Sequence, residues 1–489
     1  MTVATVARVA VLSVSSPFLI AGPEASSTFA LETDTASGVQ YGSGGHLPTT
    51  PPVATREQII AMLGVDEALA IQIEGDLDVR RQLHFNTDLD YVAGLRLHPD
   101  RVDPMYPEIP MSAGEAAEFA ARQALAPDAE ILESTLSKAE ANSYAGVWLD
   151  NQTGELVVMV TQEGAEQARA LIEQSSLAFP ERVRLHLASH SRRDLIAVQQ
   201  EFTPVVEDPM LDEPPYDLSV DVSLNRLTLR VPPSMPSEDA ARLAGMIGRS
   251  GIEYDVIVAD LAIATGGTLR NDNEAPPVYA GHGIIGTNNT VTSSPNSGIF
   301  CTNGFKVRRT SQPGREYALT AGHCFYDVKN GTWFAPVDSK VYYRSIGSNN
   351  IVAIQKAYHV VPSYDLALIE YSSATSSKIV VTAATNAYRG IDYMYSELPQ
   401  GFSVCSIGAT SNGARCGTID TWRTGDGSIR ANIANIVGGD RGVPLYAPRP
   451  DGMAAAVGIN RGSNGSQIVA SNVSDHLTGF CGDCVLVGS

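Results

Sequence analysis

Residues 438–446 read Gly-Gly-Asp-Arg-Gly-Val-Pro-Leu-Tyr, a glycine-rich loop that leads into an apolar strand at Pro444. Two other short motifs precede this loop in the chain. One holds a histidine beside a cysteine, and the other holds an aspartate at the entrance of an apolar strand. The three motifs, taken in this order, decide the fold that the sequence predicts.

The histidine motif is Leu319-Thr-Ala-Gly-His323-Cys324. A disulfide from Cys324 back to the strand at Cys301 would hold the His323 imidazole in one place. A general base must lie within hydrogen-bonding reach of the proton that it removes, so a covalently held backbone beside it favours a catalytic histidine. Taken alone, a histidine next to a cysteine is more often structural.

The aspartate motif is Tyr364-Asp365-Leu-Ala-Leu-Ile, which puts a half-buried carboxylate at the start of an apolar strand. Such a carboxylate can accept a hydrogen bond from the far nitrogen of an imidazole. This bond holds the tautomer and stabilises the imidazolium that forms during acyl transfer. By itself, an aspartate in this position is usually only a turn residue.

The sequence after about residue 262 is rich in Gly, Ser, Thr and Asn, with short alternating strands and a terminal helix expected at 474–480. Many short strands separated by turn residues indicate a β-barrel or a sandwich. The cysteines indicate disulfides and an oxidising compartment, since all six lie in this half: Cys301, Cys324, Cys405, Cys416, Cys481 and Cys484. A zinc site is the alternative, but a single Cys-x-x-Cys without a second ligand pair does not favour it.

The order of His323, Asp365 and the Gly-Asp-x-Gly-x-Pro loop resembles the chymotrypsin family, in particular its bacterial streptogrisin and α-lytic protease branch. The segments before His323, from Cys405 to Cys416 and from Gly458 to Ser463 are similar to that branch's two disulfide loops and its substrate-binding strand. The resemblance implies an all-β, trypsin-like domain of two antiparallel six-stranded β-barrels over residues 281–489.

The resemblance also implies roles for individual residues. His323 and Asp365 are the expected catalytic pair, and the backbone N–H groups of Gly439 and Arg441 are the expected oxyanion hole. The pocket rim is expected at Arg461, Gly462 and Ser463. The implied disulfides are Cys301–Cys324 and Cys405–Cys416. No cofactor and no metal are expected.

The chain departs from the family at the nucleophile, because Arg441 stands where the family has serine. A guanidinium has no acceptor and stays protonated, so it cannot attack a carbonyl. Val443 replaces a glycine, which predicts a reshaped loop. Arg461 replaces a serine and is expected to approach Asp365 from the other side. Ser428, in Gly-Asp-Gly-Ser, is the nearest imitation of the lost motif but lacks the strand that follows it.

The N-terminal half is acidic: residues 1–280 carry 18 Lys and Arg against 41 Asp and Glu, a net −23, whereas the remainder carries 16 against 13, a net +3. Neither half has the basic face of a nucleic-acid binder. Residues 1–25 predict a signal peptide and 26–55 a disordered linker. Residues 56–265 predict an α+β segment, divided by a Pro-rich linker near 206–215.

Within this acidic segment, patterns predict helices over 113–125 and 163–175, a hairpin of strands 145–150 and 155–161, and one strand over 221–231. The hairpin resembles part of the large N-terminal prosegment of the same protease branch. Such a prosegment assists folding and blocks the cleft in cis until it is cut away, here near 276–281.

Two classes of function remain open. The first is a secreted pseudoprotease that binds a peptide or protein in the former cleft, or whose prosegment remains docked. The second is an active serine endopeptidase that uses His323, Asp365 and an unrecognised nucleophile. No run of about eighteen apolar residues appears, so no membrane span is expected.

Overall fold

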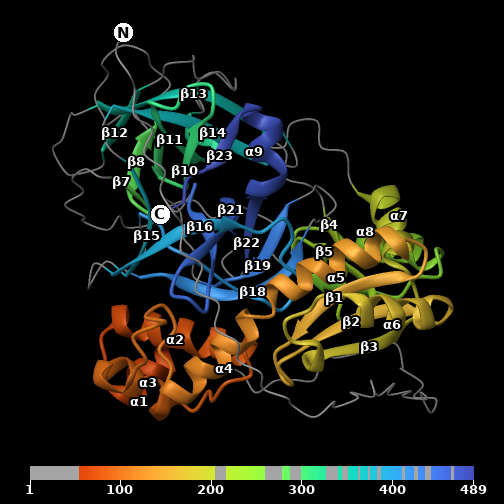
Figure 1. The fold of residues 1–489 in the computed structure, drawn as a ribbon. Coiled ribbons are helices and arrows are strands. Elements are labelled where there is room, and N and C mark those ends of the chain that lie inside the picture. The colour runs from red at the N-terminus through yellow and green to blue at the C-terminus, as the bar shows by residue number, and fades with distance from the viewer. Residues whose placement is uncertain are drawn as a thin grey trace, which may run out of the picture. The chain divides into compact units, whose positions relative to one another are not determined.

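A computed structural model of the chain describes residues 54–203, 216–258, 278–286, 299–325, 340–343, 351–361, 364–372, 375–382, 387–409, 413–422, 428–434, 442–463 and 467–488 (Figure 1). The predicted signal peptide, most of the linker before residue 54 and the linker at 206–215 lie outside these residues. All described residues belong to one compact unit. Among them, no helix combines the length and apolar character needed to cross a membrane.

The N-terminal region, residues 54–258, begins with helices that start at side-chain caps. Thr55 and Ser112 each form a capping box, and Asp66 and Asp88 each accept a backbone N–H. The first three helices pack on one another through buried Ile59, Ile73, Leu77 and Val92. The helices of this part are α1 (Arg56–Leu63), α2 (Glu67–Gln82), α3 (Leu89–Leu97), α4 (Ala113–Gln123) and α5 (Ala126–Ala139).

Two three-stranded sheets follow, and each is an antiparallel hairpin extended by a third, parallel strand. The first consists of β1 (Tyr144–Asp150), β2 (Glu155–Thr161) and β3 (Val183–Ala188), with helix α6 (Ala165–Gln174) before β3 and α7 (Arg192–Phe202) after it. The second consists of β4 (Asp217–Asp221), β5 (Arg226–Val231) and β6 (Tyr254–Val258), with helix α8 (Ser237–Gly248) between β5 and β6.

The predicted helices over 113–125 and 163–175 and the predicted hairpin are confirmed as α4, α6 and β1–β2. The single strand expected over 221–231 was wrong. The chain turns between β4 and β5, where Asn225 takes a left-handed φ of 50°. Its side-chain amide bonds the backbone of His190 in both directions at 2.9 Å, and a tolerance of that conformation is typical of asparagine.

The C-terminal region is built from two sheets. The first has eight strands in the order β23-β10-β11-β14-β13-β12-β8-β9. These are β8 (Gly283–Gly286), β9 (Ile299–Thr302), β10 (Lys306–Arg309), β11 (Glu316–Thr320), β12 (Lys340–Tyr343), β13 (Ile351–Val361), β14 (Tyr364–Tyr371) and β23 (Cys484–Leu486). Within the described ranges, no strand pairing joins its outer strands β23 and β9.

The second sheet has nine strands, and the pairing of β20 with β21 closes six of them, β20-β17-β18-β19-β22-β21, into a barrel. A closed barrel has no free edge strand. Its strands and their neighbours are β7 (Val278–Ala280), β15 (Thr375–Thr382), β16 (Ala387–Met394), β17 (Ser403–Ser406), β18 (Arg415–Trp422), β19 (Ile429–Asn432), β20 (Pro444–Pro448), β21 (Ala454–Ser463) and β22 (Ile468–Asn472). The predicted terminal helix is α9 (Val473–Cys481).

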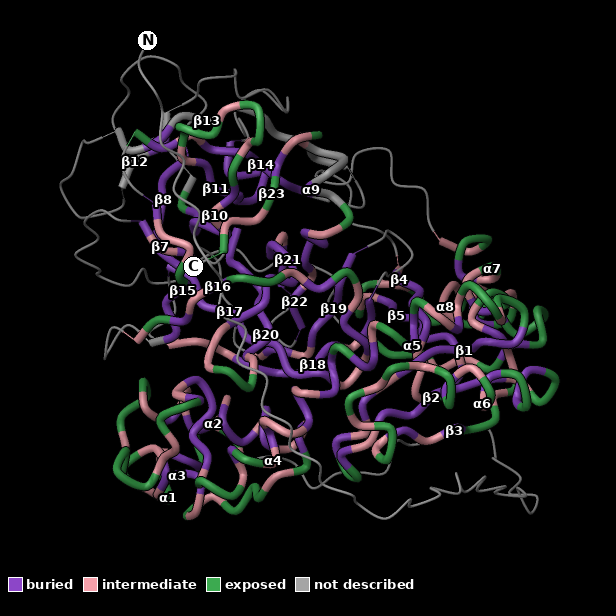
Figure 2. Tube along the Cα trace, viewed as in Figure 1, coloured by how far each residue is buried: buried purple, intermediate pink, exposed green. Residues whose placement is uncertain are grey.

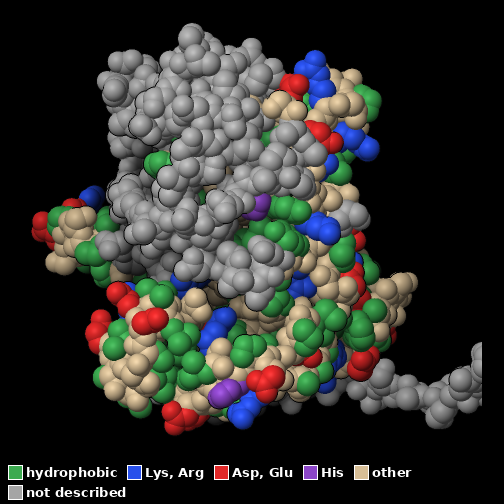
Figure 3. All heavy atoms as spheres, turned by 90° about the vertical axis from the view of Figure 1, so that its left-hand side faces the viewer, with side chains coloured by type: hydrophobic (Ala, Val, Ile, Leu, Met, Phe, Trp, Pro, Cys, Tyr) green, Lys and Arg blue, Asp and Glu red, His purple; other side chains and the backbone are tan. Residues whose placement is uncertain are grey.

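Burial follows this architecture: the barrel strands are mostly buried, whereas the helices α1, α3 and α6 are exposed along one side (Figure 2). On the face in Figure 3, the described atoms at the bottom show acidic, basic and apolar side chains side by side, without a patch of one sign. On this face, acidic side chains therefore alternate with basic and apolar ones.

All six cysteines form disulfides, and the pairs are Cys301–Cys324, Cys405–Cys416 and Cys481–Cys484. The first ties β9 to the 3₁₀ turn that carries His323, and the second joins the neighbouring strands β17 and β18. The prediction of disulfides is confirmed. The zinc alternative at Cys481 and Cys484 was wrong, because both sulfurs are bonded to each other.

Candidate active site

His323 lies in the 3₁₀ turn η5 (Gly322–Phe325) that follows strand β11. Strand β11 pairs with β14, which places Thr320 opposite Ala367 and brings the end of β11 beside the start of β14. Asp365 is the second residue of β14. Two motifs that are 42 residues apart in the sequence therefore meet because the strands that carry them are neighbours.

The structure brings His323 and Asp365 into direct contact. His323 Nδ1 lies in hydrogen-bonding contact with Asp365 Oδ2, and the backbone N–H of His323 donates to Oδ1 at 2.8 Å. The two residues are only 3% and 1% exposed. The carboxylate thus holds both the ring and the backbone of the histidine, which leaves Nε2 as the ring nitrogen that can exchange a proton with a bound molecule.

The charge on Asp365 is stabilised despite its burial. Burial by itself raises the pKa of this carboxyl, but attraction to His323, the hydrogen bonds from His323 and the positive charge of Arg461 outweigh it. The pKa of Asp365 therefore lies below its usual value. The expectation that Arg461 acts on Asp365 agrees with this electrostatic effect.

Ser471 also contacts Asp365, and no motif in the sequence predicted this contact. Its hydroxyl oxygen accepts the backbone N–H of Asp365 at 2.8 Å, and the residue is fully buried in β22. The motif around it, Ile468-Val-Ala-Ser-Asn, is an ordinary apolar strand, so no local signal marks the serine. Only the contact between β22 and β14 reveals its role.

His323 Nε2 is buried, and within the described part of the chain it has no hydrogen-bond partner. A buried imidazole nitrogen without a partner is costly in a purely structural site. In a histidine that acts as a general base, Nε2 is the atom that accepts the proton of the nucleophile. The described geometry thus contains an imidazole oriented by a carboxylate.

Gly442 is the first described residue of the glycine-rich loop 438–446. Its φ is +78°, and a Cβ at this position would lie 2.7 Å from Thr302 O and 3.0 Å from Ala321 N. Its N–H donates to Asn460 O at 2.9 Å. The glycine therefore packs against the segment that leads to His323. Gly439 and Arg441, the expected oxyanion hole, lie outside the described residues.

Val443, which was expected to reshape the loop, is buried and has no positive φ. Its carbonyl accepts the N–H of Asn460 at 2.8 Å in a regular connection to strand β21. A β-branched residue is compatible with this conformation. No backbone strain therefore arises at Val443 itself.

The expected pocket-rim residues lie at the end of β21. Arg461 is the extra residue of a β-bulge, because Asn460 and Gly462 face the consecutive residues Ala470 and Val469 of β22. A bulge redirects the side chain of the inserted residue. Gly462 N–H donates to Asn460 Oδ1 at 3.0 Å, and both Gly462 and Ser463 are buried.

Ser428, the alternative nucleophile, is fully buried immediately before β19. Two sets of potential metal ligands occur among the described residues, and each contains a disulfide: Cys301, His323 and Cys324, and Cys481, Asp483 and Cys484. A disulfide sulfur is not a thiolate, so neither set offers the sulfur ligands that zinc prefers.

Comparisons with known proteins give likeness in structure only. No family model and no curated protein matches the sequence. Nocardiopsis protease (NAPase) aligns at 20% identity with a TM-score of 0.32, over 43% of this chain and 98% of that chain. Thermobifida fusca protease A and Cellulomonas bogoriensis chymotrypsin each align at 19% identity with a TM-score of 0.31, over 43% of this chain and 99% of theirs.

We expect Asp365→Asn to change how stability depends on pH. Because the pKa of Asp365 is lowered in the folded chain, its charge stabilises the fold above the unfolded value of about 3.9. This stability is lost as the pH falls through the lower folded value. The variant should lose ~1.5–3 kcal/mol at neutral pH, as for hydrogen bonds to a charged group.

Urea unfolding at neutral and at acidic pH measures both effects. The matched control is Asp239→Asn on the exposed surface of α8. It should change neither the free energy of unfolding at neutral pH nor the loss of stability in acid. An Asp365→Asn chain with the same neutral stability and the same loss of stability in acid as the unmodified chain would contradict the prediction.

Proposed function

We propose that the chain is a secreted, non-catalytic homologue of chymotrypsin-like serine proteases that binds a peptide or protein in the former cleft. In this proposal residues 281–489 form the two-barrel domain, of which the described residues include one closed barrel. Residues 56–265 correspond to the prosegment of the family. The six paired cysteines support an oxidising compartment.

Two observations carry the proposal. Nε2 of His323 has no hydrogen-bond partner among the described residues, and the sequence places an arginine before Gly442. A working protease needs a hydroxyl that donates a proton to Nε2 while its oxygen attacks the substrate. Gly442 packs against the segment leading to His323, and the residue bonded to it in the sequence is Arg441. A guanidinium can fill that place but cannot act as the nucleophile.

A second function is favoured by one observation. The His323–Asp365 pair is buried, doubly hydrogen-bonded and supported by Ser471, as a catalytic base requires. The alternative is therefore an active serine endopeptidase with another nucleophile. Without any nucleophile, water activated by His323 would leave only about 10³- to 10⁴-fold acceleration over the uncatalysed reaction.

Labelling with a serine-directed fluorophosphonate separates the two functions. We expect no modified serine in the purified, folded full-length chain by intact mass, because the position of the nucleophile holds arginine. An active protease of this family, treated in parallel, shows that the reagent works. Stoichiometric labelling of one serine, such as Ser428, together with peptide hydrolysis that disappears in His323→Ala, would establish the alternative.

A further inference from the structure

The disulfide Cys481–Cys484 differs from the other two in its accessibility and in the ring that it closes. The four cysteines of the other two disulfides are at most 8% exposed. Cys484 is buried as well, but its partner Cys481 is only half-buried. The two cysteines are 3 positions apart in the sequence, whereas the other pairs are 23 and 11 apart. This pair therefore closes the smallest ring and contains the most accessible cysteine.

The short ring limits what this disulfide adds to the stability of the fold. A disulfide stabilises a protein mainly by restricting the unfolded chain, and in that model the effect grows with the length of the closed loop. Of the three loops, the one from Cys481 to Cys484 is the shortest by far. Opening this bond is therefore expected to cost the fold less than opening either of the other two.

Other contacts hold the turn between α9 and β23 without the sulfur–sulfur bond. Asp483 Oδ1 accepts from Arg309 Nε at 2.9 Å, and Oδ2 accepts the N–H of Ser311 at 3.1 Å. The backbone carbonyl of Asp483 accepts the N–H of Thr310 at 2.9 Å. Strand β23 pairs with β10, with Cys484 opposite Arg309. A reduced pair should therefore keep its two thiols close together, which allows the bond to form again.

The turn leaves one side of the disulfide open. Gly482 is exposed, its φ is +66°, and a Cβ at this position would have no neighbour within 4 Å among the described residues. Exchange requires that a thiolate reach one of the two sulfurs. Cys481 lies beside this glycine and is the more exposed of the pair. Its Sγ is therefore the atom that a thiolate can attack, and the buried Cys484 is the leaving group.

Asp483 places a negative charge beside the accessible sulfur. Its Oδ1 lies 3.8 Å from Cys481 Sγ. Hydrogen bonds from Ser311 and Arg309 lower the pKa of this carboxyl to about 2, so it is ionised at neutral pH. A negative charge disfavours a neighbouring thiolate and repels one that approaches. The carboxylate is therefore expected to slow the attack on Cys481 and to keep its reduced thiol neutral.

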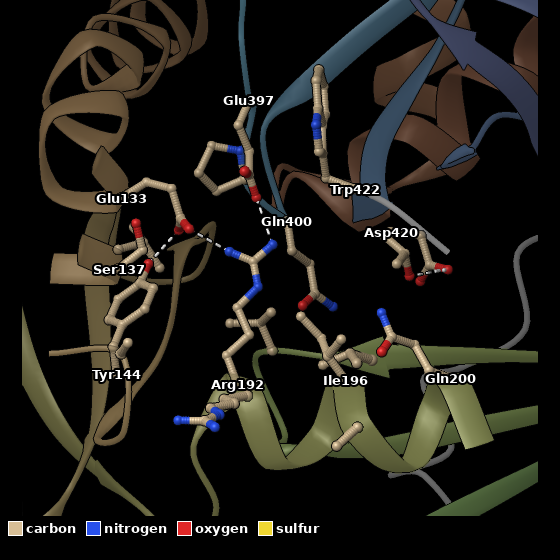
Figure 4. Close-up of a pocket in the computed structure, with 18 residues that line it drawn as sticks. Glu133, Ser137, Tyr144, Arg192, Ile196, Gln200, Glu397, Gln400, Asp420 and Trp422 are labelled. Atoms are coloured by element: carbon tan, nitrogen blue, oxygen red, sulfur yellow. Dashed lines mark hydrogen bonds and ion pairs between the residues drawn. The ribbon is translucent and has the colours of Figure 1, made fainter. Parts of the chain in front are cut away.

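The cavity of about 580 Å³ that α7 borders offers no comparable group. Figure 4 shows the guanidinium of Arg192 between Glu133 and Glu397, and its Nη2 donates to Glu397 Oε1 at 2.7 Å. Among the described residues that line the cavity, none is cysteine, histidine or lysine. The cavity therefore contains ion pairs but no side chain that could take part in sulfur exchange.

We propose that Cys481–Cys484 is a site of thiol–disulfide exchange, at which a dithiol reduces this bond reversibly while the other two disulfides stay oxidised. One thiolate of the dithiol attacks Cys481 Sγ, and the Cys484 thiolate leaves and takes up a proton. The second thiolate of the dithiol then attacks the dithiol's own sulfur in the mixed disulfide and releases Cys481. The dithiol becomes a disulfide, and two electrons and two protons pass to the cysteine pair. This inference is independent of whether the chain hydrolyses peptides.

Selective reduction of the native, full-length chain tests the proposal. The chain is treated with dithiothreitol at neutral pH, quenched with acid and alkylated with N-ethylmaleimide, and peptide mass mapping locates the modified cysteines. We expect Cys481 and Cys484 to be reduced at least about 10²-fold faster than the other pairs, because buried disulfides react only after the fold opens. An unchanged far-UV circular dichroism spectrum shows that the dithiol form is folded. Reduction of this pair no earlier than the other two would overturn the proposal.

Two single substitutions test which sulfur is attacked. Cys484→Ser leaves the half-buried thiol of Cys481, whereas Cys481→Ser leaves the buried thiol of Cys484. With glutathione disulfide as the probe, we expect the folded Cys484→Ser chain to form a mixed disulfide at least about tenfold faster than the folded Cys481→Ser chain. Equal rates, or a faster reaction of Cys481→Ser, would overturn the assignment of Cys481 as the attacked residue.

Asp483→Asn tests the effect of the neighbouring charge. Removing the carboxylate beside Cys481 should speed reduction by dithiothreitol about three- to tenfold. The matched control is Asp475→Asn, which removes the same charge from the exposed first turn of α9, at the other end of the helix. The control should leave the rate unchanged. A folded Asp483→Asn chain that is reduced no faster than the control would overturn the role assigned to this carboxylate.

Discussion

We expect the variant Arg441→Ser/Arg461→Ser to hydrolyse peptide substrates at least about 10³-fold faster than the unmodified chain. Among the described residues Nε2 of His323 has no hydrogen-bond partner, and a serine at 441 is expected to supply a hydroxyl for it. Losing such a nucleophile costs about 10⁶-fold in a working serine protease, so even a poorly aligned replacement should give a large gain.

The two substitutions should contribute unequally. Arg441→Ser alone restores the nucleophile, but Arg461 still attracts the Asp365 carboxylate that must stabilise the imidazolium. Removing that charge should raise kcat further. Adding Val443→Gly should change little, because Val443 already has an ordinary backbone conformation.

Turnover of a broad peptide library at neutral pH, with and without fluorophosphonate, is the measurement. Arg441→Ala is the matched control, since it removes the same guanidinium but adds no hydroxyl. His323→Ala in the repaired chain should abolish the new activity. A repaired, folded chain that neither hydrolyses peptides nor reacts with fluorophosphonate would show that the loss of activity is not local to residues 441 and 461.

Gly442→Ala is expected to destabilise the C-terminal region by about 3 kcal/mol or more. Its φ of +78° is unfavourable for alanine, and the added methyl would meet Thr302 O at 2.7 Å and the backbone of Ala321. Thr302 ends β9 and Ala321 follows β11, so moving these backbone atoms aside would disturb the pairing of β9 with β8 and of β11 with β14. The variant should therefore lose stability and disturb the His323 turn together.

Thermal or urea unfolding of the full-length chain checks this prediction. Gly413→Ala is the control, because a Cβ there has no neighbour within 4 Å among the described residues and its φ is not in the left-handed region. The control should change the free energy of unfolding by less than about 1 kcal/mol. Equal stability of the two variants would show that the loop tolerates a side chain at residue 442.

The sequence by itself determined the elements whose signals are local. Alternating strands and turn residues predicted the β-rich C-terminal region, helical patterns over 113–125 and 163–175 predicted α4 and α6, and the turn at 151–154 predicted the β1–β2 hairpin. The sequence also predicted the pairing of His323 with Asp365 and the arginine at the position of the nucleophile, because these depend on residue type and order. A local pattern carries this information since it reflects backbone preference within a few residues.

Tertiary structure decided everything that depends on which strands become neighbours. Ser471 bonds Asp365 only because β22 lies beside β14, and no sequence motif marks this serine. The same is true of the buried ion pair between Arg389 and Glu108, whose members are 281 residues apart. A hydrogen bond or an ion pair acts over a few ångströms in space, so its partners cannot be identified until the fold brings them together.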